Sequence, residues 1–193
     1  QVAWYADEGF RADDLALRAI AAAATAADRD AVSRALHAIY DPWVDETARK
    51  FQGEALKQYA GETGLAVSAG TCVVFVDALR FDLGQRLARR LGSLEVEVSP
   101  RLAAFPTVTP TGQPAVAPVH AGFGAGPSFD AGDASGRSIK GQVFRAALSD
   151  EGVQYLQWTA AETGDVNGIA WTQTNTIDAL GHDHGHALAA MLD

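Results

Sequence analysis

Apolar residues recur at helical spacing through the first third of the chain. One apolar stripe predicts an amphipathic helix and comprises Val32, Leu36, Ile39, Tyr40 and Trp43. Asp41 followed by Pro42 indicates that a new helix begins there, with a buried face made of Val44, Ala48, Phe51 and Ala55. The alanine-rich segment 21–27 favours helix by propensity. Glycines near residue 64 end this pattern, so we predict a helical N-terminal segment (1–64) followed by a main domain (65–193).

The pattern changes to that of an α/β domain after Thr71. Residues 72–76 form an unbroken apolar run, typical of a strand buried on both faces of a parallel sheet. Three leucines at helical spacing then predict an amphipathic helix that ends at Gly92, namely Leu83, Leu87 and Leu91. Segment 94–98 is expected to be the second strand of a βαβ unit. We also predict a helix at 113–119, a loop at 122–136, a helix at 142–148, and strands at 153–158 and 169–174. The fold class expected is α/β, a mostly parallel sheet flanked by helices.

Composition excludes several classes of protein. A net charge of −9 argues against a duplex-binding surface built only from lysine and arginine, although a phosphate-bearing substrate is compatible with it. Cys72 is the only cysteine, so no internal disulfide can form, and we interpret it as a small buried hydrophobe. No apolar stretch reaches the length of a membrane span and no signal peptide is visible. We therefore expect a cytoplasmic protein with no membrane partner.

The most informative stretch is Asp178–His186, DALGHDHGH. Asp178 is followed by His182 four residues on, with His184 and His186 close behind. Carboxylate oxygen and neutral imidazole nitrogen are ligands that zinc prefers. The alternative is an exposed polar turn. His37 and His120 are interpreted as structural, because we find no carboxylate at ligand spacing beside them.

Side chains from two upstream segments could meet this run in one site. Asp77 is the first polar residue after the apolar strand, and ligands of open α/β sheets bind beyond the carboxyl ends of the strands. The alternatives are a helix N-cap or an ordinary strand-end aspartate. The second segment is PTVTPTG, residues 106–112, where prolines stiffen a loop that carries the competing hydroxyls of Thr107, Thr109 and Thr111. Its alternative is a turn with ordinary capping hydroxyls.

Together these residues fit one chemistry. A threonine hydroxyl does not ionise near neutral pH, but coordination to a divalent cation lowers its pKa and positions it for in-line attack on phosphorus. A second cation would stabilise the phosphoryl oxygens and activate the hydrolytic water. An acid, an alcohol and an acid–imidazole pair would then share one edge of the sheet.

Three segments carry a family resemblance: VVFVDALRFDLG (73–84), FPTVTPTGQPAVAPV (105–119) and AWTQTNTIDALGHDHGHAL (170–188). In this order they resemble a PglZ domain of the alkaline-phosphatase superfamily, known from bacteriophage-exclusion (BREX) and phage-growth-limitation defence systems. They frame nearly the whole region from Thr71 to the end, whereas the helical N-terminal segment is not covered. The resemblance implies a metal-dependent phosphatase or phosphodiesterase of bacterial phage defence.

The resemblance also implies residue roles. Asp77 would be a metal ligand, Thr109 the metal-bound nucleophile, and Asp178 with His182 the ligands of the other metal, expected to be zinc. Thr111 is the second candidate nucleophile, and His186 is a further candidate ligand. Arg80 would hold a phosphate oxygen, or alternatively form a salt bridge on the helix surface.

The chain departs from the superfamily pattern at its end. The superfamily supplies a further Asp-His pair and a last histidine after this element, and the chain stops at Asp193. We therefore expect a domain that is incomplete at its C-terminus, with the two-metal site completed by residues beyond this segment. The expected partners are a phosphate-ester substrate, with nucleic acid as one candidate, and other defence proteins. Two alternatives stay open: an inactive scaffold domain that binds partner proteins, and an unrelated α/β domain whose histidines chelate metal incidentally.

Overall fold

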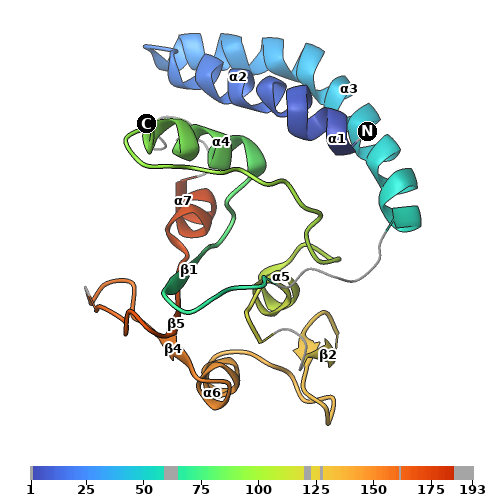
Figure 1. Ribbon diagram of the computed structural model, residues 1–193. Helices are drawn as coiled ribbons and strands as arrows, with labels where there is room; N and C mark the ends of the chain where they lie inside the picture. Colours follow the sequence, from blue (N-terminus) through green and yellow to red (C-terminus); the bar gives the residue numbers. More distant parts are fainter. Residues whose placement is uncertain (1, 59–64, 120–122, 127, 161, 185–193) are drawn as a thin grey trace. The chain divides into compact units, whose positions relative to one another are not determined.

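The computed structural model describes residues 2–58, 65–119, 123–126, 128–160 and 162–184 (Figure 1). They confirm the expected α/β class, with helices and a small parallel sheet. The chain divides into two compact units. Unit 1 comprises residues 1–60, 79–100 and 178–193, and unit 2 comprises residues 61–78 and 101–177.

Unit 1 is helical. It contains α1 (Val2–Trp4), a π-helical turn η1 (Tyr5–Gly9), α2 (Phe10–Ala21), α3 (Ala26–Gln58) and α4 (Phe81–Arg90). Helix α2 packs against both α3 and α4, as Figure 1 shows. Helix α7 (Thr176–His184) starts at the end of unit 2 and continues into unit 1.

Two predicted helix boundaries in this region are wrong. The alanine-rich segment 21–27 is not one helix, because α2 ends at Ala21 and α3 starts at Ala26. Thr25 and Asp28 fix the second start: each backbone N–H donates to the other's side-chain oxygen at 3.1 Å, a reciprocal capping arrangement. No helix begins at Pro42, which lies inside the 33-residue α3. The long helix tolerates the loss of the one backbone hydrogen bond that proline cannot donate.

The predicted buried faces in unit 1 are also wrong in part. Ile39 on α3 is 72% exposed, and Val44 and Phe51 are exposed too. On α4, Leu87 is exposed, as is Leu91 just beyond its end, whereas Asp82 and Arg86 are buried with Leu83. The reason is charge compensation. Arg86 Nη2 donates to Asp14 Oδ1 on α2 at 2.9 Å, so the packed face carries paired ions.

Unit 2 is built on a parallel sheet of order β1–β5–β4. Its strands are β1 (Thr71–Val76), β4 (Val153–Tyr155) and β5 (Ile169–Thr174). Helix α6 (Gln142–Asp150), helix α5 (Thr109–Ala115) and the antiparallel pair β2 (Gly124–Ala125) and β3 (Ala131–Gly132) complete it. The predictions for β5 and α6 are confirmed, β4 is shorter than expected, and the predicted 122–136 loop contains β2 and β3.

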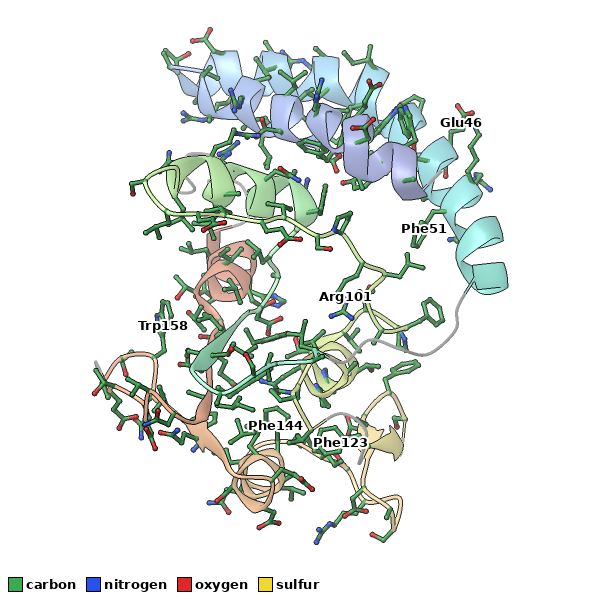
Figure 2. The ribbon with its side chains drawn as sticks, in the orientation of Figure 1. Glu46, Phe51, Arg101, Phe123, Phe144 and Trp158 are labelled. Carbon is green, nitrogen blue, oxygen red and sulfur yellow. The ribbon has the colours of Figure 1, made fainter. Side chains whose placement is uncertain are left out.

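The core of unit 2 is centred on Trp171, which is fully buried. Phe75 stacks on its ring and Phe144 of α6 meets it edge-on, at centroid distances of 5.9 Å and 5.5 Å. Phe123 packs against Phe144 in turn (Figure 2). Aromatic pairs in these arrangements add to the stability that burial supplies, so they hold β5 firmly between its neighbours.

The sheet differs from the predicted βαβ unit. The parallel partner of β1 is β5, and segment 94–98 is not a strand, because none of the described strands pairs with it. Cys72 and Val74 are exposed, so the prediction of a strand buried on both faces is wrong. Side chains alternate along a strand; those of Val73 and Phe75 pack on the core, and the intervening side chains face the other way.

Candidate functional site

Asp77 lies directly beyond the end of β1. Its backbone N–H donates to the carbonyl of Thr174 at 2.9 Å, which extends the β1–β5 ladder by one bond. The next residue, Ala78, has a φ of 59°, and its N–H donates to Asp77 Oδ1 at 3.0 Å. The side chain therefore emerges at the carboxyl edge of the sheet, as predicted. The N-cap alternative is wrong, because Arg80 occupies the N-cap position of α4.

Thr109 is brought to Asp77 by the start of α5. Its hydroxyl Oγ1 lies 2.9 Å from Asp77 Oδ2 and 3.1 Å from Oδ1. The predicted helix at 113–119 starts too late: α5 spans Thr109–Ala115. Proline near the first helical position favours this earlier start, and Pro110 occupies that place. Thr109 therefore lies in the first turn of a helix rather than on the preceding loop. Its side chain is exposed, whereas Asp77 is half-buried.

Polar contacts fix α5 in unit 2. The Thr111 hydroxyl donates to the backbone carbonyl of Phe129. Gln113 Nε2 donates to Gln173 Oε1 of β5 at 2.5 Å, and Trp171 Nε1 donates to the same oxygen at 3.3 Å. The two candidate nucleophiles therefore have different hydrogen-bond acceptors. The Thr111 hydroxyl donates to a backbone carbonyl, whereas the Thr109 hydroxyl donates to a carboxylate.

The two glutamines are positions near the candidate site that the sequence reasoning missed. Gln113 and Gln173 both lie within the segments that carry the family resemblance. Their connection across 60 positions cannot be inferred from spacing.

Asp178 and His182 lie one turn apart on α7, with His182 Nε2 3.6 Å from Asp178 Oδ1. The predicted i,i+4 relationship is confirmed, but on a helix rather than at a strand end or in a turn. His182 is exposed and Asp178 is half-buried. His186 and His120 lie outside the described residues. The structure thus pairs Asp77 with Thr109 in unit 2, and Asp178 with His182 in unit 1.

The donor types of these two pairs fit partial ligand sets for zinc. One pair offers carboxylate and hydroxyl oxygen, the other carboxylate oxygen and imidazole nitrogen, and zinc accepts these donors. Within the described part of the chain, no group of three or more His, Cys, Asp or Glu side chains is arranged to hold a metal ion. A complete metal centre, with both pairs contributing, stays a prediction.

Arg80 forms a salt bridge, its predicted alternative role, but with a buried partner rather than on the helix surface. Its Nε lies 3.0 Å from Asp82 Oδ1 and its Nη2 3.2 Å from Oδ2, and Asp82 is fully buried.

The prediction that His37 has no carboxylate at ligand spacing is wrong. Asp41 lies four residues on, and its Oδ2 is 2.6 Å from His37 Nδ1. That pair is exposed on α3.

Comparisons with known proteins leave the family open. No family model, no curated protein and no solved structure matches the chain. The PglZ resemblance therefore depends on the three sequence segments themselves and stays a prediction. Among the helices described, none is long and apolar enough to cross a membrane.

Proposed function

We propose that this chain is a metal-dependent phosphatase or phosphodiesterase-type domain of a bacterial anti-phage defence protein, with Thr109 as its nucleophile. The observation that supports the proposal is the contact of the Thr109 hydroxyl with both oxygens of Asp77. A weak alcohol nucleophile needs an adjacent group that accepts or loosens its proton. The carboxylate at the end of β1 is such a group.

The chain's own residues would perform the following steps. Thr109 Oγ1 attacks phosphorus and forms an O–P bond while the ester P–O bond breaks, and the released alkoxide takes up a proton as it leaves. The proton of the Thr109 hydroxyl passes to the Asp77 carboxylate and from there to water, and water supplies the proton that the departing alkoxide takes up. Water then cleaves the phosphorylated threonine, which releases the phosphate and restores the hydroxyl. The Thr111–Phe129 and Gln113–Gln173 contacts keep α5, and with it Oγ1, in place.

Asp77 and Thr109 would hold one divalent cation, and Asp178 and His182 a second, as the family resemblance implies. Such cations lower the pKa of a bound hydroxyl and offset the charge of the phosphoryl group. The proposal thus assigns a role to each of the residue pairs.

The test is hydrolysis of bis(p-nitrophenyl) phosphate and p-nitrophenyl phosphate by the intact protein with zinc or manganese. Thr109→Ala should lower the rate by about 10³-fold or more, the effect expected of a lost nucleophile. Thr107→Ala, at an exposed threonine two positions earlier, is the matched control and should retain most of the activity. Equal rates for wild type and both variants would remove the enzyme proposal and leave the scaffold alternative.

A further inference from the structure

Unit 1 contains a pocket of about 670 Å³ that the proposed phosphoryl transfer does not use. This volume lies in the range of small-molecule sites. Its aromatic lining comprises Trp4, Tyr5, Tyr40, Trp43 and Phe51. Phe51 projects from α3 in Figure 2. Aromatic walls of this density are unusual for a surface depression, because exposed apolar side chains commonly occur singly.

A cluster of charged side chains lies at the wall of this pocket. The Tyr5 and Tyr40 hydroxyls each donate to one oxygen of the Asp13 carboxylate. Arg80 Nη2 is 3.7 Å from Asp13 Oδ2, and the same guanidinium binds Asp82. Asp13 and Arg80 line the pocket and their charges balance, whereas Asp82 is fully buried behind them.

The remaining charges of the lining cancel. Glu46 accepts a hydrogen bond from Lys50 one turn further along α3, and both line the pocket. Burial, reinforced by the hydrogen bond to Asp13, raises the pKa of the Tyr5 and Tyr40 phenols well above their ordinary value. The two tyrosines therefore stay neutral and add no charge of their own to the pocket.

The aromatic walls are fixed by local packing. Trp4 and Tyr5 stand where α1 passes into the π-helical turn, a rare element that is frequent at functional sites. A Cβ on Gly9 would lie 2.9 Å from Trp4 Cζ3 and 3.0 Å from Tyr5 Cδ2, so both rings pack directly on that glycine. Across the pocket, Tyr40 and Trp43 stack with centroids 5.5 Å apart. The walls are therefore arranged before a ligand arrives.

We propose that this pocket binds a small organic cation with an alkylated ammonium head group. Tryptophan and tyrosine faces attract such a cation through the ring quadrupole, and the hydrogen bonds that Tyr5 and Tyr40 donate to the Asp13 carboxylate make their rings more electron-rich. Alkyl groups on nitrogen also match the apolar walls. Both Asp13 oxygens already accept phenol hydrogen bonds, so the carboxylate contributes through these two rings. This function is independent of the phosphoryl transfer proposed for Thr109.

Calorimetric titration of the intact protein with choline and with its neutral isostere 3,3-dimethylbutan-1-ol tests the proposal. Choline should bind at least about tenfold more tightly, because only the cation is attracted by the ring quadrupoles. Equal affinities for the two compounds would show that the pocket recognises only apolar groups and would overturn the proposal. Failure of choline to bind would also overturn it. A peptide carrying trimethyl-lysine that binds about tenfold more tightly than choline would overturn the assignment to a free small cation.

Variants locate the binding site. Trp43→Leu should weaken choline binding by about tenfold or more, whereas Trp43→Phe keeps a ring and should lose less. Trp158→Leu is the matched control, since Trp158 is exposed and lies in unit 2 outside the pocket (Figure 2). Circular dichroism verifies that each variant folds. If Trp43→Leu does not fold, Phe51→Leu replaces it, since Phe51 is 44% exposed. Unchanged choline affinity in every folded pocket variant would overturn the proposal.

Discussion

Thr109 Oγ1 lies 2.9 Å from Asp77 Oδ2 and 3.1 Å from Oδ1, although 32 positions separate the two residues in the chain. The contact joins the end of β1 to the first turn of α5 within unit 2. Nothing in local sequence requires an exposed hydroxyl to meet that carboxylate. The pair is therefore the starting point for predictions about chemistry.

Asp77→Asn should lower phosphodiester hydrolysis by about 10²-fold or more, because the amide keeps the shape but accepts no proton. The measurement is initial rate at saturating zinc or manganese. Asp45→Asn is the control, since Asp45 forms an exposed ion pair with Arg49 on α3. An Asp77→Asn protein as active as Asp45→Asn would exclude Asp77 from the reaction.

Asp178→Ala and His182→Ala should each reduce zinc affinity by about tenfold or more, as expected when one ligand of a metal site is removed. Isothermal titration of the intact protein measures this. Asp183→Ala is the matched control, because Asp183 is an exposed carboxylate next to His182 on α7. Affinity that survives the loss of Asp178 would support incidental chelation by the histidines.

Asp14→Asn should destabilise the protein by about 2 kcal/mol at pH 7, because it removes the carboxylate charge to which the buried Arg86 guanidinium donates hydrogen bonds. Burial alone would raise the pKa of Asp14, but the Arg86 hydrogen bond and the Arg18 charge hold it below its ordinary value. A depressed pKa gives stability that is present above the unfolded pKa of about 3.9 and is lost as pH falls through the folded value. The difference between variant and wild type should therefore shrink below about pH 4.

Urea unfolding at pH 7 and at pH 3 measures both effects of Asp14. Asp45→Asn serves again as the control and should change stability by less than about 1 kcal/mol, as exposed pairs do. A difference between Asp14→Asn and wild type that is unchanged at pH 3 would contradict the role of the Asp14 charge.

Gln113→Ala should lower kcat by about tenfold and KM much less, since it loosens α5 without removing a group that touches substrate. The side-chain bond to Gln173 that it removes is worth about 1 kcal/mol of stability. Gln142→Ala, at the exposed start of α6, provides the comparison. Equal kcat values for the two variants would show that the Gln113–Gln173 contact does not position Thr109.

The parts of the fold that sequence predicted are those with a strong local pattern. The strand at 169–174, the helix that starts at Gln142 and the i,i+4 spacing of Asp178 and His182 agree with the prediction. These features depend on neighbouring residues only.

The errors arise where tertiary contacts decide the outcome. Arg86 is buried because Asp14 lies across from it on α2, and segment 94–98 has a strand-like pattern but no strand pairs with it in the described structure. Thr109 was singled out by family resemblance, but its place on α5 follows from Pro110 and from the contacts of Thr111 and Gln113. The aromatic pocket combines residues of the continuous helical segment 2–21 with residues of α3 and with Arg80, and could not be predicted.

The most direct test of the account is to locate the covalent phosphate during turnover. The intact protein, acid-quenched in the presence of substrate and zinc, would be digested and analysed by peptide mass spectrometry. The account predicts phosphate on Thr109 in wild type and none in Thr109→Ala, whose hydrolysis is lost. Phosphate on Thr111 instead, or steady hydrolysis by Thr109→Ala, would contradict it.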